Sequence, residues 1–289
     1  MSHKQIDIDY NVRNTVSTEL FDEIIAEYRT RSKEAVDGLD GYADVRYDPD
    51  SLECLDVWGT RRGTLRPAFV AIHGGYWRAL SRHHTAFMAR VLDSAGIATV
   101  TVDYGLAPAT PLEEIVRQVR AAVAWVHHHG AEHGLDPDRI VVGGSSAGGH
   151  LTAATMTPGW QEPLGLPADV VRAAMPISGL FDIRPLVDSF ANEWLNLDPK
   201  RARALSPMLE CSQTGPRAVI AVAEHDGVGF LEQSRMFHDA WSRHSDSELL
   251  VVPDRNHYDI FLDLADPGSA LSTALVSLFD RLGGPSSTP

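Results

Sequence analysis

Five small residues, Gly144-Ser145-Ser146-Ala147-Gly148, place the tightest constraint on how this chain can fold. They follow the apolar run RIVVGG and precede the small-residue stretch AGGHLTAA, which predicts a strand that turns sharply into a helix. Larger neighbours would collide with such a turn, and the two outer glycines leave the room that it needs. The pattern G-x-S-x-G in this context is typical of a nucleophilic serine, and its register selects Ser146 because position 147 is alanine. A glycine-rich turn with a capping serine is the alternative.

Short apolar runs alternate with helical stretches along most of the chain. We expect strands at 53–59, 68–73, 97–102, 139–143, 171–178, 216–223 and 248–253. We expect helices at 18–36, 84–95, 110–129, 230–244 and 267–282, and a loop at 40–50. Thr110 should cap its helix, with Pro111 in the first helical position. Strands that alternate with helices of 10–15 residues predict an α/β fold with a mostly parallel central sheet flanked by helices.

No stretch of the sequence reads as a linker between domains, so we expect one domain over residues 1–289. Residues 1–50 form an N-terminal helical segment in this interpretation, and they are a candidate cap. Residues 179–215 are irregular with helical pieces, and they are a candidate lid. The last residues, 283–289, have the composition of a frayed tail.

The formal net charge of −14 argues against nucleic acid and anionic membrane surfaces as partners, because both require a basic footprint. No apolar run approaches the roughly 18 residues that span a bilayer, and the N-terminus has no secretory pattern. We therefore expect a cytoplasmic protein that acts on a small molecule, with a homodimer as a candidate assembly.

A second glycine-rich segment, His73-Gly74-Gly75-Tyr76-Trp77, follows the strand AFVAI directly. Acyl transfer builds negative charge on a carbonyl oxygen, and preorganised N–H donors stabilise that charge. We assign Gly74, Gly75 and Tyr76 to such an oxyanion hole, together with the residue after the nucleophile, Ala147. The sequence leaves open which two of the three loop N–H groups point inward. His73 should hold the loop by a hydrogen bond, and a plain turn after a strand is the alternative.

The general base should follow the last strand, and His257 stands there in ELLVVPDRNHYDIF. The acid should follow the strand before it, where Asp226 is the first choice and Glu224 the reserve. The chain order Ser146, Asp226, His257 is the order that a G-x-S-x-G hydrolase uses. The acid would orient the imidazole and stabilise the imidazolium.

Thirteen histidines invite a metal interpretation, but their spacing argues against it. Residues 127–129 are three successive histidines, which cannot share one helical face. The chain contains no H-E-x-x-H, no C-x-x-C and no nucleotide-binding glycine motif. We expect neither a metal nor a cofactor, and we expect Cys54 and Cys211 to be free thiols.

The segments HGGYW, DYGLAP and GGSSAGGH resemble the esterases and lipases related to hormone-sensitive lipase, although Gly105 and Ala109 depart from the usual DYRLAPE. The chain is more similar to the arylformamidases, the kynurenine formamidase group. That similarity rests on HGGYW and on YNVRN, SGLFDIRPL, ALSPM, EHDGVGFLEQS and NHYDI, between about residues 9 and 262. It implies the α/β-hydrolase fold, the Ser146-Asp226-His257 triad, and hydrolysis of an arylformamide such as N-formylkynurenine.

Tyr76, Trp77 and Tyr258 are candidates to stack on an aryl substrate, and Phe190 and Trp194 are candidates for a lid. Two arginines, Arg78 and Arg82, are candidates to bind a substrate carboxylate. A small-molecule carboxylesterase or arylesterase is the main alternative function. A non-catalytic ligand-binding protein on the same fold is a remote one.

Overall fold

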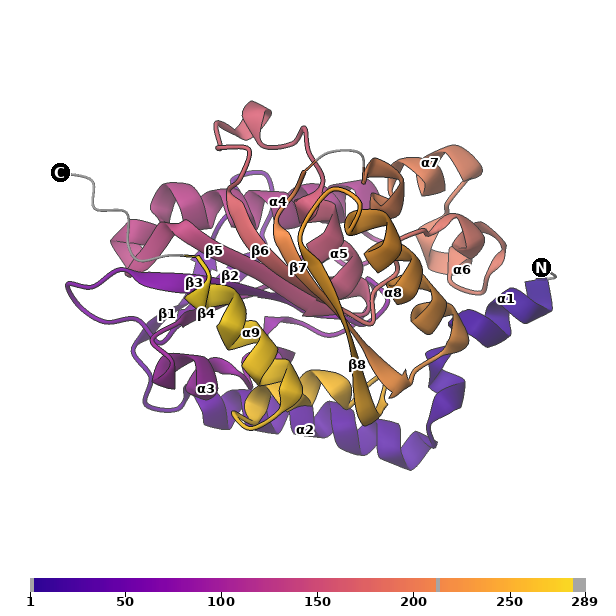
Figure 1. The fold of residues 1–289 in the computed structure, drawn as a ribbon, viewed down its shortest axis with the longest axis horizontal. Coiled ribbons are helices and arrows are strands. Elements are labelled where there is room, and N and C mark those ends of the chain that lie inside the picture. The colour runs from indigo at the N-terminus through magenta and orange to yellow at the C-terminus, as the bar shows by residue number, and fades with distance from the viewer. Residues whose placement is uncertain (1–2, 212–213, 283–289) are drawn as a thin grey trace.

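A twisted eight-stranded sheet runs through the computed structural model, which describes residues 3–211 and 214–282 (Figure 1). The strand order is β1-β2-β4-β3-β5-β6-β7-β8, with antiparallel pairing between β1, β2 and β4 and parallel pairing elsewhere. The strands are β1 (Gly41–Arg46), β2 (Cys54–Trp58), β3 (Arg66–Ile72), β4 (Ala98–Val102), β5 (Leu135–Ser145), β6 (Val171–Ile177), β7 (Arg217–His225) and β8 (Ser247–Asn256). The predicted mostly parallel sheet is confirmed. The tail predicted at 283–289 lies outside the described residues.

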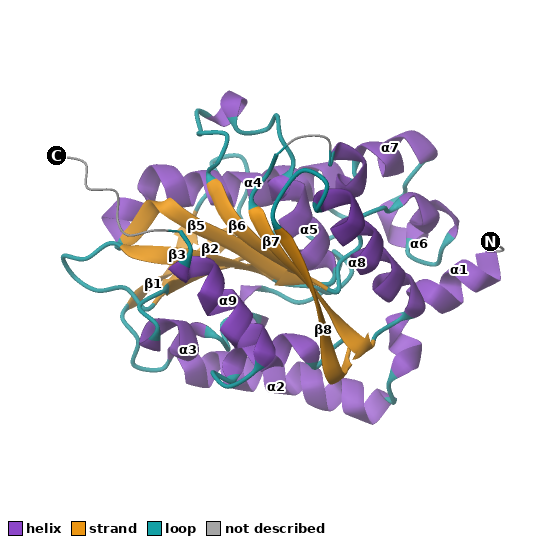
Figure 2. Cartoon of the chain, in the orientation of Figure 1, coloured by secondary structure: helices purple, strands orange, loops and turns teal. Residues whose placement is uncertain are grey.

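Helices cover both faces of the sheet (Figure 2). On one face, α4 (Leu112–His129), α5 (Ala147–Met156) and α8 (Val228–Trp241) pack on side chains such as Val70 and Ile72 of β3. On the other face, α2 (Thr18–Val36), α3 (Ala89–Ser94) and α9 (Ala270–Asp280) pack on Phe69 and Ala71 of the same strand. The alternation of side chains along a strand therefore divides the core into two layers.

Two irregular segments complete the fold. The first comprises α1 (His3–Tyr10) and the 3₁₀ turn Val12–Thr15, which lead into α2. The second, between β6 and β7, carries the 3₁₀ turns Arg184–Asp188 and Pro207–Glu210 and the short helices α6 (Asn192–Leu195) and α7 (Pro199–Ala204). Further 3₁₀ turns are Arg82–His84, Gly130–His133, Glu162–Leu164 and Ile260–Ala265. None of the helices in the described ranges is long and apolar enough to cross a bilayer.

The structure corrects three local predictions. Residues 41–46, expected in a loop, form β1, an almost fully exposed edge strand that lacks an alternating apolar pattern. The helix expected at 84–95 is reduced to a 3₁₀ turn and the short α3. Thr110 does not cap α4, because Pro111 occupies the N-cap with an extended backbone and no side-chain cap bond. The prolyl ring fixes φ near −65° but leaves ψ free, so the first helical position shifts by one residue.

Candidate active site

Ser146 lies at the junction of β5 and α5 with φ 60° and ψ −118°, a backbone conformation that non-glycine residues rarely adopt. Its N–H donates to the Ile177 carbonyl at 2.9 Å, and its carbonyl accepts from the His150 N–H at 3.1 Å. The neighbouring backbone therefore holds the sharp turn.

The two outer glycines of the motif are required by close backbone contacts. A Cβ atom at Gly144 would lie 2.4 Å from the Ile72 carbonyl oxygen, and one at Gly148 would lie 2.2 Å from the same oxygen. Real Cβ atoms do not approach backbone so closely. The end of β3 thus packs directly on the turn, which places the residues after β3 beside Ser146.

Three side chains from distant parts of the chain form one hydrogen-bonded line. His257 Nε2 lies 3.0 Å from Ser146 Oγ, and His257 Nδ1 lies 2.8 Å from Asp226 Oδ1. The Gly227 N–H also donates to Asp226 Oδ1 at 2.7 Å. All three side chains are buried. Because an ionised carboxylate only accepts hydrogen bonds, Nδ1 carries the proton and Nε2 is left to accept from the serine hydroxyl.

The loop after β8 fixes the position of His257. Asn256 and Asp259 close this loop with bonds of 2.7 Å from the Asn256 backbone N–H and side-chain amide to the Asp259 carboxylate. The Tyr28 hydroxyl of α2 donates to the Tyr258 carbonyl at 2.5 Å. The Phe230 ring lies 4.5 Å from the imidazole, measured between centroids. The loop is therefore bonded to α2, and the imidazole packs against a side chain of α8.

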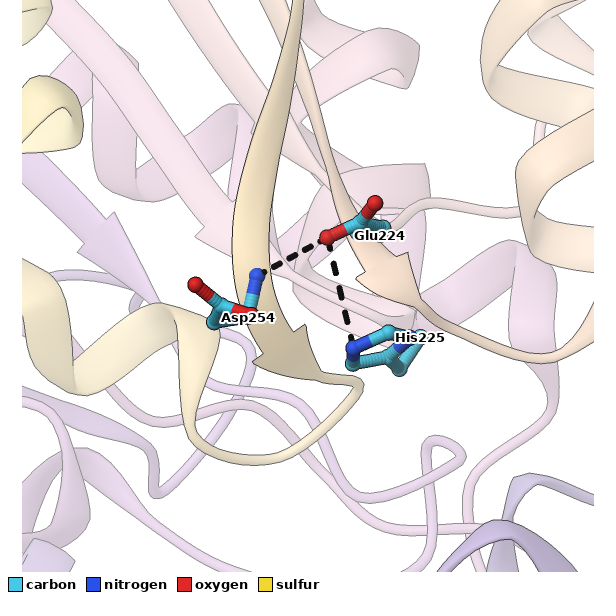
Figure 3. Close-up of side chains that lie close together, drawn as sticks. All are labelled: Glu224, His225 and Asp254. Atoms are coloured by element: carbon cyan, nitrogen blue, oxygen red, sulfur yellow. Dashed lines mark hydrogen bonds and ion pairs between the residues drawn. The ribbon is translucent and has the colours of Figure 1, made fainter.

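Glu224, the reserve acid, lies apart from this line. Its carboxylate accepts from the Asp254 backbone N–H at 3.0 Å, and His225 lies 4.0 Å from it (Figure 3). One ligand atom from each of these three exposed residues could meet at a metal ion, since the atoms lie within 4.8 Å of one another. Exposed acidic groups often cluster without an ion, and nothing else at this position indicates one.

The glycine-rich loop after β3 turns sharply beside Ser146. Gly75 has φ +97°, and a Cβ atom there would lie 2.3 Å from the Ala79 carbonyl oxygen. Tyr76 also has positive φ, at 52°. Within the described chain, the N–H groups of Gly75, Tyr76 and Ala147 have no protein acceptor, so these amides remain available to an oxygen in the cavity.

His73 holds this loop by a hydrogen bond and by a ring contact with Tyr104. Its Nδ1 lies 2.8 Å from the Gly74 carbonyl, and its ring stacks on Tyr104 at 4.0 Å between centroids. The Tyr104 hydroxyl donates to the His73 carbonyl at 2.9 Å. Burial lowers the pKa of His73 to about 4, so the imidazole is neutral near pH 7. His73 therefore has a supporting position in the loop, as its sequence context predicts.

A cavity of about 500 Å³ opens over Ser146 and His257. Its walls are largely aromatic or aliphatic, and they come from the N-terminal segment, from the segment before α7 and from the loops after β3 and β8. The apolar lining residues are Val12, Phe21, Ile25, Tyr28, Tyr76, Ala79, Leu80, Phe190, Trp194, Tyr258 and Phe261. Gly74 and Gly75 line the cavity next to Ser146. Arg13 and Arg78 add two positively charged side chains to these largely apolar walls.

Two of the three predicted substrate contacts, Tyr76 and Tyr258, line the cavity, and the third does not. Trp77 is fully buried in the core and packs edge-on against His150 of α5, 5.1 Å away between centroids. Its φ of 58° is one that non-glycine residues rarely adopt. The prediction that Trp77 contacts substrate is therefore wrong. Phe190, a candidate lid residue, does line the cavity.

The two arginines named as carboxylate binders have different surroundings. Arg82 is buried among Asp44, Asp56 and Asp103, and its Nε lies 3.0 Å from Asp56. These carboxylates neutralise its charge away from the cavity, so the prediction for Arg82 is wrong. Arg78 does line the cavity.

Sequence reasoning named the N-terminal segment as a candidate cap, but it did not select the residues of that segment that line the cavity. Arg13, Phe21, Ile25 and Tyr28 all line it. The helical spacing of the last three indicated an apolar face, but nothing in that spacing says what the face packs against.

Comparison with known proteins identifies the family. A family model described as alpha/beta hydrolase fold matches residues 69–258. The chain is 29% identical over 273 residues to a kynurenine formamidase of Salmo salar, with 90% of each chain covered. It is 25% identical to a kynurenine formamidase of Drosophila melanogaster, covering 80% of this chain and 79% of the other. The resemblance drawn from the sequence motifs is thereby confirmed.

The chain is also similar to esterases and to solved structures of the same fold. Esterase LipQ of Mycobacterium tuberculosis is 28% identical over 68% of this chain and 51% of its own. A crystal structure from Silicibacter sp. TM1040 superposes with a TM-score of 0.78 at 27% identity, covering 96% of this chain and 99% of the other. The carboxylesterase EstE1 superposes with a TM-score of 0.73 at 20% identity, covering 92% and 97%, which supports the fold. The chain is thus a hydrolase, and it belongs to the alpha/beta hydrolase fold family.

Proposed function

We propose that this hydrolase is an arylformamidase that cleaves the N-formyl group from an arylamine, with N-formylkynurenine as its substrate. The supporting observation is the extent of similarity to the kynurenine formamidases. The match to the salmon protein covers 90% of both chains, whereas LipQ is matched over about half of its own length. A match of that extent reaches beyond residues 69–258, the region that the family model covers.

In the proposed mechanism, Ser146 is the nucleophile and His257 the general base. The hydroxyl oxygen attacks the formyl carbon while His257 Nε2, 3.0 Å away, accepts the hydroxyl proton. Asp226 keeps Nδ1 protonated and stabilises the imidazolium that forms. The oxygen of the tetrahedral intermediate carries the negative charge.

That oxygen should be bound by backbone N–H groups of the loop after β3 and of Ala147 at the start of α5. Gly74, Gly75 and Tyr76 are the candidate loop donors, because the N–H groups of all three have no acceptor within the described chain. Donors held rigidly at this position stabilise the transition state more than the planar formamide.

Collapse of the intermediate breaks the C–N bond, and His257 returns the proton to the leaving arylamine. A formyl ester of Ser146 remains. Water then attacks this ester with His257 again as the base, which releases formate and restores the hydroxyl. The aromatic cavity walls supply contacts for the arylamine, while the formyl group itself needs little space.

A small-molecule carboxylesterase is the second candidate, favoured by the similarity to esterases such as LipQ. The same residues cleave either substrate, so comparative kinetics decides between them. We expect kcat/KM for N-formylkynurenine to exceed that for p-nitrophenyl acetate by several hundredfold. The opposite preference would assign the chain to the esterases.

Ser146→Ala tests the nucleophile in the same assays. We expect kcat to fall on the order of 10⁴-fold or more for both substrates, because no group replaces the attacking oxygen. Ser145→Ala is the matched control, since it removes the neighbouring hydroxyl from the same cavity. A larger loss from Ser145→Ala than from Ser146→Ala would contradict the assignment. The cytoplasmic location and the homodimer stay predictions.

A further inference from the structure

Two arginines at the cavity wall lack the carboxylate partner that several other arginines of this chain have. Arg66, Arg117 and Arg201 each pair with a carboxylate, as expected in a protein with 39 acidic and 25 basic residues. Arg13 and Arg78 line the cavity, and in the described part of the chain neither has a carboxylate within 4.0 Å. An acidic protein thus keeps two unpaired cations beside its candidate nucleophile.

Both guanidinium groups are held by aromatic rings of the same cavity. Arg13 lies over the Phe21 ring at 4.1 Å, and Arg78 lies over the Trp194 ring at 4.2 Å. A planar guanidinium stacked on a ring keeps its N–H edge free for a second partner. Arg13 uses part of that edge, in a long bond of 3.4 Å to the Ser17 carbonyl.

The positive charge of Arg13 acts on Tyr258, the residue after the candidate general base. Burial raises the pKa of Tyr258 to about 12, and the positive charge of Arg13 opposes that rise. The Tyr258 ring lies 5.2 Å from the His257 ring, measured between centroids. The Tyr258 ring also lies 5.0 Å from the Phe21 ring on which Arg13 stacks, so a continuous row of two rings connects Arg13 with the imidazole.

We propose that Arg13 and Arg78 bind a carboxylate of the substrate, so that this site selects anionic arylamides over neutral ones. The inference rests on the proposed function in taking this cavity as the substrate site. A formyl group carries no further substituent, so the carboxylate must belong to the leaving arylamine. Ser146 is buried, Arg13 is half-buried and Arg78 is exposed, which orients the arylamine outward from the nucleophile.

The test compares substrates that differ only in charge. N-formylkynurenine is paired with its carboxamide, and an aryl acetate bearing a propanoate side chain is paired with its carboxamide. We expect the wild-type enzyme to prefer the carboxylate of each pair by about tenfold to hundredfold in kcat/KM, mainly through KM. Arg13→Gln, Arg78→Gln and the double variant should reduce that preference stepwise.

Arg62→Gln is the matched control. This variant removes the same charge from an exposed turn that precedes β3, whereas Arg78 lies in the loop that follows β3. It should keep the wild-type preference. Arg13→Lys should retain part of the preference, because lysine keeps the charge but loses the planar fork. Circular dichroism and the Ser146-dependent rate on each carboxamide establish that the variants are folded.

Each outcome has one meaning. No wild-type preference, or an equal loss on both members of a pair in the Arg13 and Arg78 variants, overturns the carboxylate site. Slow turnover of both formamides with fast turnover of the acetates overturns the arylformamidase proposal alone, and the acetate pair still measures the arginines. A preference that falls only in the cavity variants supports the inference.

Discussion

The backbone of Ser146 is held in its unusual conformation by its neighbours. A non-glycine residue at φ 60° carries roughly 1–3 kcal/mol of strain. The Ile177 carbonyl, the His150 N–H and the close approach of Ile72 to two glycines keep the turn in place without the serine side chain. Alanine at position 146 should therefore preserve the fold, so that loss of activity reports on the hydroxyl itself.

The acid of the candidate triad gives a second prediction at the residue scale. Asp226→Asn should lower kcat about 10³- to 10⁴-fold, because an amide at this position stabilises the imidazolium poorly and favours the wrong tautomer. Glu224→Gln, two residues away, should leave kcat near the wild-type value, since its carboxylate faces the Asp254 N–H. Steady-state kinetics on one substrate measures both. The reverse ranking would place the acid at Glu224.

Single residues also show how far sequence reasoning reaches. Ser146, Asp226 and His257 could be selected before the structure was considered, because a strand-turn-helix motif and chain order constrain them. Trp77 and Arg82 were placed wrongly, because side-chain direction depends on tertiary partners that neighbouring positions in the sequence do not reveal. The carboxylates around Arg82 come from Asp44, Asp56 and Asp103, each far from it in the sequence.

At the scale of elements, α2 and β1 show why some segments are predictable and others are not. The apolar spacing of α2 predicts Thr18–Val36, the bounds that the structure shows, and Ser17 accepts the Leu20 N–H as its N-cap. β1 has no buried face, so its strand conformation depends on pairing with β2, which no local pattern encodes. The position of α2 beside the candidate active site also depends on residues that are distant in the sequence, so no local pattern predicts it.

Tyr28 provides a test of that position. Tyr28 lies on the buried face of α2. Its hydroxyl donates to the carbonyl of Tyr258, the residue after the candidate base. We expect Tyr28→Phe to lower the free energy of unfolding by about 1–2 kcal/mol, because that carbonyl loses its donor. Turnover should fall as well, since the histidine loop loses a contact. Urea denaturation and kinetics measure the two effects.

Tyr42→Phe is the control for this prediction. Tyr42 lies on the exposed strand β1, and its hydroxyl has no hydrogen-bond partner within the described residues. Its loss should change the free energy of unfolding by less than about 0.5 kcal/mol. Equal effects of the two substitutions would show that the bond from α2 to the histidine loop contributes little.

At the scale of the whole molecule, the two core layers bury groups that resist protonation. His73 and His150 are both buried, and burial lowers the pKa of each to about 4. In the unfolded chain both should titrate near 6.5. Below pH 6.5 the unfolded state therefore binds protons that the folded state does not, and the free energy of unfolding decreases as the pH falls toward 4.

This linkage predicts a loss of about 2 kcal/mol per histidine between pH 7 and pH 5. His150→Gln should remove one such contribution, because glutamine stays neutral and can still donate to the Leu205 carbonyl that His150 Nε2 contacts. Urea denaturation at several pH values measures the slope, and carboxylate titrations cancel in the difference from wild type. His244→Gln, an exposed control, should keep the wild-type slope. If His150→Gln also kept that slope, the buried imidazole would have to accept its proton in the folded protein, and the core around it would be more open to charge than its packing indicates.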